Sequence, residues 1–468
     1  MSQKLTDLVD KESIQKAIEA ALVNGGDFAE VFIEDRQSNS VSLDDGRIDN
    51  LASSSDQGAG IRIIAGETTG FAHTSDISAE SLIKAAQAAA KAISGANSTT
   101  EIQELNFEAS PVETIKTQHD EITKQEKVEL LRSANKSARQ AGDEISQVAA
   151  RYGEKNRSIL VANSEGVFRN DDQTKTLFSI SSVASGDSGM QTGRESIGFN
   201  VGYELFEEYD VTELAKIASQ RAIDKLKAKP APAGTWPVVI GPGSGGVMFH
   251  EACGHGLEAD LVHKGASVFA NRVGELVASP LVTLIDDGTM AKEWGTYRID
   301  DEGHVATSNT LIKDGILLDY LWDSKTARKH KHKPSGNGRR QSYKHLPMVR
   351  MTNTYLQAGT STPEEIIASV DYGVYVAKLG GGQVDTTSGD FVFGMVESYL
   401  IENGKLTQPL REGQLIGNGP KVLTQIEAVG NDFQMGPPGT CGKDGQGVPV
   451  GDGVPTLKVA ALTIGGSA

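Results

Sequence analysis

Two histidines and a glutamate near the middle of the chain form the pattern that most clearly predicts chemistry. His250, Glu251 and His255 lie within residues 247–260, which read Val-Met-Phe-His-Glu-Ala-Cys-Gly-His-Gly-Leu-Glu-Ala-Asp. Zinc hydrolases hold their metal with neutral imidazoles and use a nearby carboxylate to accept a proton from the attacking water. The pattern therefore predicts a catalytic metal site, with His250 and His255 as ligands and Glu251 as the general base.

The spacing of the two histidines is unusual for a metal site on a helix. Zinc-binding histidines usually stand four residues apart, so that both side chains point the same way. Here they stand five apart, which separates side chains on a regular α-helix by roughly 140°. The helix must end or bulge between them if both bind one ion, and Gly254 permits such a break with little strain. The alternative is an ordinary helix whose histidines bind no metal.

A catalytic zinc ion takes three protein ligands and leaves one position open. The candidates for the third ligand are Cys253, Glu258, Asp260 and the distant Cys441. Glu258 follows His255 at a helical spacing, whereas Cys253 would need a very tight loop to share an ion with both histidines. Cys441 lies in a glycine-rich segment beside Lys443, and a nearby cation favours the thiolate that binds metals. We favour Cys441, although a free cysteine is more often a small buried hydrophobe.

The elements before the motif predict a mixed domain over residues 1–229. Apolar residues recur at helical spacing over residues 11–22, 77–93, 121–141 and 211–226. Alternating runs predict strands over residues 28–33, 38–43, 58–65, 68–74, 146–152, 159–163, 167–169, 176–185 and 190–203. Residues 44–47 and 66–67 are typical hairpin turns. Helices and strands in both halves of this segment predict an α+β arrangement.

Residues 230–234, Pro-Ala-Pro-Ala-Gly, form the clearest domain boundary. A strand at residues 236–240 and a loop at residues 241–246 then lead into the motif helix. The loop matches Gly-x-Gly-x-x-Gly, but Pro242 removes a backbone donor and no βαβ repeat follows, so we predict close helix packing rather than a dinucleotide site.

The rest of the chain predicts a β-rich domain over residues 235–468, with a large antiparallel sheet or barrel-like body that carries the metal site. Predicted strands cover residues 281–286, 304–307, 310–313, 316–321, 349–356, 372–379, 391–402, 424–429 and 457–464. A short helix is predicted from residue 363 to 370. The strongest hairpin signal is Asn403-Gly404.

Composition limits the classes of function. Of the 468 residues, 38% are hydrophobic and 52 are glycine, which is typical of a globular, turn-rich protein. No apolar run predicts a membrane span, and the N-terminus lacks the apolar core of a signal peptide. With only two cysteines, a disulfide framework is disfavoured and a reducing compartment, most simply the cytoplasm, is predicted.

The net charge of −17 disfavours nucleic-acid binding by the whole surface, because phosphates would be repelled. One basic segment stands out: residues 328–333, Arg-Lys-His-Lys-His-Lys, are followed by Arg339, Arg340, Lys344 and His345. We interpret it first as a solvated loop. The alternatives are a nucleic-acid patch, or a lid whose cations meet a peptide carboxylate or an acidic partner.

Several segments together resemble the TldD/PmbA family, on its TldD branch, over essentially the whole chain. They are residues 250–260, 336–340 (Gly-Asn-Gly-Arg-Arg), 347–354 (Pro-Met-Val-Arg-Met-Thr-Asn-Thr), 380–385 (Gly-Gly-Gly-Gln-Val-Asp) and 439–446 (Gly-Thr-Cys-Gly-Lys-Asp-Gly-Gln). The resemblance implies a zinc metallopeptidase with His250, His255 and Cys441 as ligands and Glu251 as base. The partner branch lacks the histidine motif, which places this chain on the catalytic side.

The resemblance also implies a heterodimer with a PmbA (TldE) paralogue that encloses the active site. Implied substrates are unfolded or small peptides, including modified precursors, but the particular substrate does not carry over. An extended peptide could pair with a strand edge, with Arg340 and Asp390 as candidates for binding its ends. Either residue could instead form a structural ion pair.

Two rival functions remain open at the level of sequence. One is a zinc hydrolase that acts on non-peptide amides. The other is a non-catalytic scaffold or regulatory binding protein, in which the histidines are structural and the basic segment is the contact surface. The separate Glu251 disfavours the scaffold, because a purely structural metal site does not require it.

Overall fold

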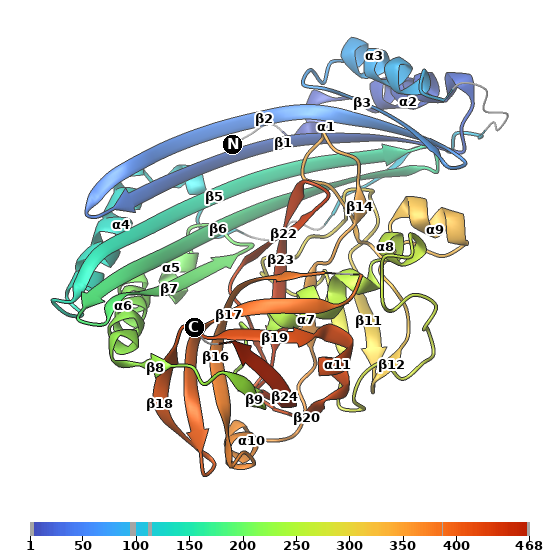
Figure 1. Ribbon diagram of the computed structural model, residues 1–468. Coiled ribbons are helices and arrows are strands. Elements are labelled where there is room, and N and C mark those ends of the chain that lie inside the picture. The colour runs from blue at the N-terminus through green and yellow to red at the C-terminus, as the bar shows by residue number, and fades with distance from the viewer. Residues whose placement is uncertain (1–3, 94–99, 111–114, 386, 466–468) are drawn as a thin grey trace.

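Four unusually long strands form an arch over the rest of the molecule (Figure 1). They are β1 (Phe28–Asp44), β2 (Arg47–Ala65), β5 (Ile145–Asn163) and β6 (Val167–Gly186). The sheet order is β3-β2-β1-β5-β6-β4, with β7 beside β6. The shorter strands are β3 (Thr68–Thr74), β4 (Asn106–Glu108) and β7 (Gly189–Phe199). The computed structural model describes residues 4–93, 100–110, 115–385 and 387–465.

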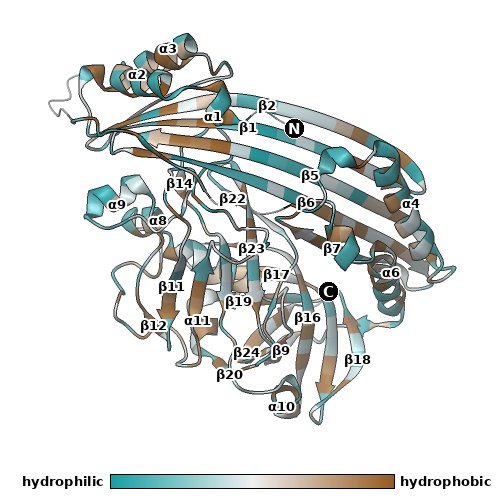
Figure 2. Ribbon diagram, turned by 180° about the vertical axis from the view of Figure 1, so that it is seen from behind, coloured by the Kyte–Doolittle hydropathy of each residue, from teal (hydrophilic) through white to brown (hydrophobic). Residues whose placement is uncertain are grey.

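The long strands correct the prediction of several short ones. The predicted strands 28–33 and 38–43 are one strand, paired with β2 without interruption from Phe28 opposite Ile64 to Ser42 opposite Asn50. The middle of each strand carries polar residues (Figure 2), because the described helices cover the two ends of the sheet and the middle pairs instead with polar groups of the C-terminal part, as Arg157 does with Asp301. Alternation of apolar and polar residues indicates one apolar-covered face, so the alternation stops in the middle while the backbone pairing continues.

Two helices cover each end of the arch. At one end lie α2 (Lys11–Ala21) and α3 (Ala79–Ala90), and at the other lie α4 (Lys124–Arg139) and α6 (Val211–Lys227). Helix α4 begins with a capping box between Thr123 and Glu126, and the Asp210 side chain caps α6. These four predicted helices are confirmed to within a turn. The short helices α1 (Leu5–Leu8) and α5 (Leu205–Glu208) were not predicted.

The C-terminal part of the chain contains a closed ring of strands. The ring runs β16-β9-β24-β19-β17 and closes through β16–β17 pairing. Its members are β16 (Tyr372–Val384), β9 (Gly234–Ile240), β24 (Leu457–Gly465), β19 (Gln414–Asn418) and β17 (Asp390–Glu402), and β18 (Lys405–Arg411), β8 (Lys229–Pro230) and β20 (Ile426–Val429) extend it. The predicted α+β class with a barrel-like, β-rich C-terminal part is confirmed. Pairing is mostly antiparallel, with β16–β9 and β18–β8 parallel.

A second sheet lies beside the ring and supplies the hairpin that carries Cys441. Its order is β12-β11-β10-β15-β23-β21, with β22 paired to β23. The strands are β10 (Leu284–Asp287), β11 (Ser308–Lys313), β12 (Ile316–Leu317), β15 (Asn353–Leu356), β21 (Gln434–Met435), β22 (Gly439–Lys443) and β23 (Gln446–Val454). The predicted strand 304–307 is wrong, since Val305 forms only an isolated bridge with Ile299.

The remaining elements are short. The pair β13 (Gly338–Arg339) and β14 (Met348–Val349) forms a small ladder. Four helices, α8 (Ala259–His263), α9 (Ser324–His330), α10 (Pro363–Ala368) and α11 (Gly419–Thr424), fill the C-terminal part. Helix α10 confirms the helix predicted from residue 363. None of the helices in the described ranges combines the length and the apolar character needed to cross a bilayer.

Ion pairs join the basic segment to the arch. Arg328 pairs with Glu165, Lys329 with Glu67 at 3.0 Å, and Lys344 with Asp56 at 2.9 Å. The segment is solvated, as interpreted, since residues 329–333 and Lys344 are exposed, but residues 328–330 belong to helix α9 (Ser324–His330) rather than to a loop. We retain the division into residues 1–229 and 235–468 as a proposal, and call the two sides the N-terminal and C-terminal regions.

Candidate metal centre

The motif helix changes its winding between the two histidines. Helix α7 (Gly246–Phe249) passes into a π-helical turn over His250–Gly254, followed by a 3₁₀ turn over His255–Leu257. The N–H of His255 donates to the carbonyl of His250, five residues earlier. With this hydrogen bond between residues five apart, five residues complete about one turn of the helix. Both imidazoles therefore point away from the helix on the same side. The predicted bulge between the histidines is confirmed.

Close packing explains the glycine within this turn. Gly254 has ordinary helical angles, with φ of −55°. A Cβ there would lie 2.2 Å from Met351 Sδ, so only glycine lets the turn sit against this side chain. Gly246 is equally confined, because its Cβ would lie 2.3 Å from the backbone N of Gly453. The predicted role of the glycine loop in close helix packing is confirmed.

Three buried side chains converge beside the turn. His250, His255 and Cys441 each offer one ligand atom, and these atoms all lie within 4.8 Å of one another. Cys441 Sγ lies 3.2 Å from His255 Nε2, and the two imidazole rings stand nearly perpendicular with centroids 5.2 Å apart. Within the described residues, this is the one such group of histidine, cysteine and carboxylate side chains that could hold a metal ion.

His250 carries the observation that points most directly to a ligand. The side chain is buried, and neither imidazole nitrogen has a well-aligned hydrogen bond among the described residues, although the Cys441 sulfur lies close enough to interact with it. An unpaired buried polar group of this kind costs about 1–3 kcal/mol. A metal ion bound to one nitrogen removes part of that cost, so the residues present fit a metal with nitrogen and sulfur ligands.

The orientation of His255 is set by a carboxylate behind it. Its Nδ1 lies 3.0 Å from Glu258 Oε2, and Lys443 Nζ lies 3.0 Å from the same oxygen. Although burial opposes its charge, the pKa of Glu258 falls to about 2 because Lys443 and His255 lie beside it. The ionised Glu258 holds the proton on Nδ1 and leaves Nε2 facing Cys441, which is the arrangement of a metal-binding histidine.

Cys441 is held as a thiolate. Burial alone would raise its pKa, but His250 and His255 outweigh burial and lower the pKa of Cys441 to about 4. Arg350 fixes the hairpin by donating to the carbonyl oxygens of Cys441 and Gln446, one on each strand. The thiolate is the form of cysteine that binds metals.

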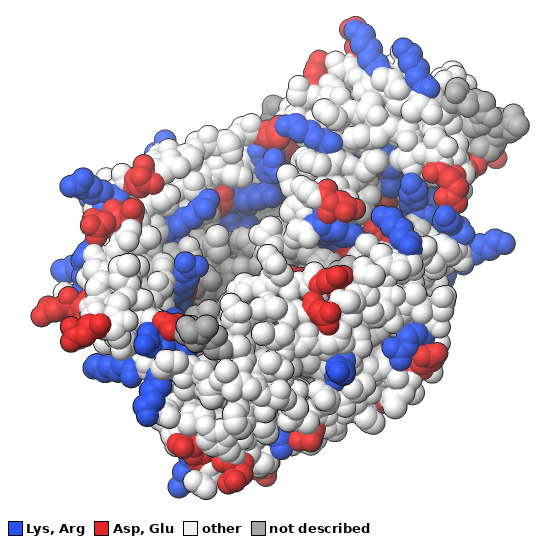
Figure 3. Space-filling view, viewed as in Figure 1, with Lys and Arg blue, Asp and Glu red and all other residues white. Residues whose placement is uncertain are grey.

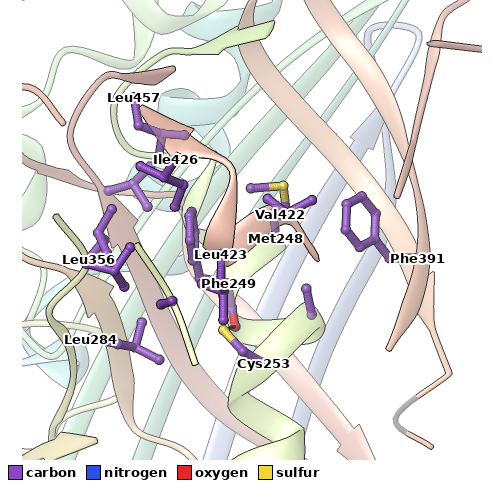
Figure 4. Close-up of a cluster of buried hydrophobic side chains, with 14 of the residues drawn as sticks. Met248, Phe249, Cys253, Leu284, Leu356, Phe391, Val422, Leu423, Ile426 and Leu457 are labelled. Carbon is purple, nitrogen blue, oxygen red and sulfur yellow. Dashed lines mark hydrogen bonds between the residues drawn. The ribbon is translucent and has the colours of Figure 1, made fainter. Parts of the chain in front are cut away.

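The other candidates for the third ligand do not join the cluster. Cys253 Sγ donates to the Phe249 carbonyl oxygen at 2.9 Å, and burial raises its pKa to about 12. Figure 4 shows Cys253 among apolar side chains such as Met248 and Phe249. Asp260 pairs with Lys443 at 2.7 Å, and Glu258 supports His255 from behind.

Glu251 lies at the open side of the cluster. Its Oε2 lies 3.9 Å from His255 Nε2, and its side chain is 26% exposed whereas that of His255 is 7% exposed. The half-buried carboxylate therefore reaches both solvent and the atoms that would hold the metal, as a general base must.

Arg340 and Asp390 lie apart from these residues. Arg340 is buried, pairs with Glu30 and donates to the Asp301 carbonyl oxygen at 2.8 Å. Asp390 is exposed, accepts hydrogen bonds from Ser388 and Asn418, and lies on the wall of a groove of about 810 Å³. Neither side chain is among the converging ligand residues.

Comparison with known proteins places the chain in a family. Models of the PmbA/TldA metallopeptidase family match its domain 1 at residues 29–93, its central domain at 118–226 and its C-terminal domain at 233–466. The match to the C-terminal domain contains all three converging side chains. The chain belongs to the PmbA/TldD family of metallopeptidases.

Curated relatives extend the match over the whole length. A metalloprotease TldD homolog of Buchnera aphidicola is 40% identical over 98% of this chain and 97% of its own length. A protein of the same name from Haemophilus influenzae is 40% identical over 94% and 93%. A zinc metalloprotease TldD homolog from Saccharolobus solfataricus is 32% identical over 63% of this chain and 66% of its own.

Solved structures share the fold of this PmbA/TldD family member. A Thermotoga maritima protein, named as a candidate modulator of a DNA gyrase, matches with a TM-score of 0.81 and 21% identity, over 97% of this chain and all of its own. TldE from Thermococcus kodakarensis matches with a TM-score of 0.74 and 20% identity, over 96% and 100%. At this identity the likeness concerns the fold alone.

Sequence reasoning missed the supporting residues of this metallopeptidase site. The sequence predicts Lys443 as a cation that favours the Cys441 thiolate, but it does not predict the contact of Lys443 with Glu258. The signal was available, because Cys441 and Lys443 stand two apart on a strand and share a face. Arg350 lies within the family segment 347–354, but nothing in its spacing indicates which carbonyl oxygens it binds.

Proposed function

We propose that this protein is a zinc metallopeptidase that cleaves unfolded or small peptides. The observation that carries the proposal is the convergence of His250, His255 and Cys441, with the spare nitrogens of His250 buried and Glu251 at the open side. Two imidazoles and a thiolate suit zinc, and three protein ligands leave a position open for chemistry. The zinc metalloprotease name of the Saccharolobus solfataricus relative supports this choice of metal.

The residues divide the work of peptide hydrolysis. His250, His255 and Cys441 would hold the metal, which when bound supplies Lewis acidity toward the scissile carbonyl and the attacking water. Glu251 accepts the proton of the water and delivers it to the leaving amine. Glu258, anchored by Lys443, keeps the His255 proton on Nδ1 throughout.

We further propose that a PmbA/TldE-type paralogue is the partner, as a heterodimer that encloses the site. The likeness of this fold to TldE from Thermococcus kodakarensis supports a common architecture for the two branches. Both described cysteines are free, which agrees with action in a reducing compartment such as the cytoplasm. Asp390 remains our candidate for binding one end of a peptide, from the wall of its groove.

The test is cleavage of unstructured peptides by the protein together with its PmbA/TldE-type paralogue. Glu251→Gln is expected to lower kcat by about 10²–10⁴-fold, because the amide cannot accept the water proton. Metal content is expected to stay the same, since Glu251 is not among the converging ligands. Glu364→Gln, an exposed change of the same kind on α10, serves as the matched control and is expected to leave kcat unchanged.

Two outcomes would overturn this proposal. Equal cleavage by the wild type and Glu251→Gln would show that Glu251 is not the general base, and would favour the non-catalytic scaffold function. Cleavage of small non-peptide amides with no activity on peptides would favour the rival hydrolase. The metal itself is checked by elemental analysis, in which His255→Ala is expected to lose the zinc that the wild type retains.

A further inference from the structure

A small pocket between the arch and the C-terminal region is lined mainly by cations. Its charged residues are Lys155, Arg157, Lys175, Arg339 and Arg340, with Asp301 as the single carboxylate. Two glutamines and residues 447–449 of β23 complete the wall. We call it the cationic pocket. A concentration of positive charge inside a chain of net charge −17 requires a physical explanation.

Only part of this charge is balanced by the protein. Arg157 pairs with Glu34 at 2.6 Å and with Asp301 at 2.9 Å, and Arg340 pairs with Glu30. Lys175 instead donates to the carbonyl oxygen of Trp294, and Arg339 to those of Met351 and Pro449. Carbonyl oxygens carry no net charge, and no described carboxylate pairs with Arg339, which lies over the Tyr297 ring. Burial holds the pKa of Lys175 well below its usual range, which favours the neutral amine, and an anion nearby would favour its protonation.

Several donors around the pocket have no acceptor. Lys155 Nζ makes no hydrogen bond or ion pair within the described part of the chain, and Arg157 Nη2 and Arg340 Nη1 are buried without a partner there. Burial, followed by the nearby Arg157 and Arg36, lowers the pKa of Lys155 to about 8. Burying the Lys155 ammonium beside the unpaired guanidinium donors costs free energy. An anion bound between them would offset that free energy.

The cationic pocket lies next to the candidate metal centre. Val448 lines the pocket and stands directly opposite Cys441 in the β22–β23 hairpin. A larger cavity of about 350 Å³ shares Lys155 and Lys175 with the pocket and is also lined by residues 38–40 and Trp294. Figure 3 shows a hollow between the arch and the C-terminal region with Lys and Arg side chains on its wall.

Size restricts the ligand to one small anionic group. The pocket itself has about 20 Å³ of solvent space, little more than one water molecule requires. This space accepts one carboxylate oxygen, which the unpaired guanidinium donors of Arg157 and Arg340 can bind. The adjoining cavity has room for the residues attached to that carboxylate.

We propose that the cationic pocket binds a carboxylate group of the peptide substrate and positions the peptide beside the metal centre. The carboxylate belongs either to the C-terminus of the peptide or to an acidic side chain. This inference rests on the proposed peptidase function. It adds a preference for acidic peptides that the metal cluster alone does not supply.

Binding measured without turnover tests this inference. Fluorescence anisotropy is recorded on the full-length Glu251→Gln protein with four labelled hexapeptides, which combine a C-terminal acid or amide with an internal Asp or Asn. A carboxylate that reaches the pocket is expected to tighten binding by about tenfold or more over its neutral counterpart. The pair of peptides that shows the difference identifies the source of the carboxylate.

Variants of Lys155 assign the preference to the pocket. Lys155→Met is expected to abolish the difference between acidic and neutral peptides, and Lys155→Arg to retain it. Lys405→Met, which removes one exposed positive charge on β18, is the matched control and is expected to keep the full preference. Circular dichroism is expected to show an unchanged fold in each variant.

Three results would overturn the inference: equal binding of all four peptides, no binding of any, or a preference that persists in Lys155→Met. Failure of the proposed peptidase function has a different signature. It would show as absent cleavage or absent zinc in the wild type, neither of which enters the anisotropy measurement.

Discussion

The two sides of the π-helical turn differ sharply although a single short segment supplies both. On one side Cys253 packs with Met248 and Phe249 in the apolar core of the C-terminal region (Figure 4). On the other side His250 and His255 face Cys441. Both cysteines are buried and free, so burial does not distinguish them.

The neighbours of each sulfur decide its chemistry. Among the described residues no charged group stabilises a Cys253 thiolate, and burial raises its pKa to about 12. Around Cys441 two imidazoles overcome burial and lower the pKa to about 4. The same residue type is therefore a small hydrophobe on one side of the turn and a metal ligand, as we propose, on the other.

Loss of the Cys441 thiolate is expected to have the largest effect. Cys441→Ser replaces a soft thiolate with a hydroxyl that stays protonated, so metal affinity is expected to fall by more than about 100-fold, beyond the loss from changing a supporting residue. Competition with a chelator measures this change. Retention of wild-type affinity would show that Cys441 is not a ligand.

Removal of the charge behind His255 is expected to weaken metal binding less. Glu258→Gln keeps a hydrogen-bond acceptor near Nδ1 but leaves Lys443 with one carboxylate, Asp260, beside the carbonyl oxygen of Val349. We expect metal affinity to fall by about 10–100-fold, the usual range for such supporting groups. Glu275→Gln, at an exposed site, is the control, and an equal effect of both changes would contradict the supporting role.

A change at the centre of the turn is expected to affect both sides. Gly254→Ala places a methyl group against Met351 Sδ, so overpacking is expected to cost about 1–3 kcal/mol of stability and to move His255. Chemical denaturation measures the cost. Gly394→Ala, where a Cβ meets nothing closer than 4.0 Å, is the control and is expected to be nearly neutral.

The smallest effect is expected on the core side. Cys253→Ala leaves a small cavity beneath Phe249 and removes one hydrogen bond, at a cost of about 1 kcal/mol. Metal affinity is expected to stay at the wild-type value in the chelator assay. A loss of metal as large as that of Cys441→Ser would reverse the assignment of the two cysteines.

Sequence patterns predicted the parts of the site that depend on local geometry. The spacing of His250 and His255 forced a bulge, and the bulge is present as a π turn. The four long helices followed from apolar spacing, whereas the caps at Thr123 and Asp210 were not predicted. In each case the signal and the structure lie within one short segment.

The features that were not predicted depend on contacts between distant segments. Lys155 reads as one polar residue in a polar stretch, and its place beside Arg157, Lys175 and Arg339 requires the folded arch. The continuity of β1 and β5 was missed because their middles carry polar residues and lack alternation of apolar and polar side chains. Ring closure through β16–β17 likewise depends on pairing that no local pattern encodes.

Cobalt substitution tests the central claim most directly. Cobalt(II) bound to a thiolate absorbs in the near ultraviolet through sulfur-to-cobalt charge transfer, so the spectrum reports the sulfur ligand itself. The wild type and Cys253→Ala are expected to show this band at equal strength, and Cys441→Ser is expected to lack it. A band that survives in Cys441→Ser, or that disappears in Cys253→Ala, would contradict the assignment of Cys441 as the metal-binding cysteine.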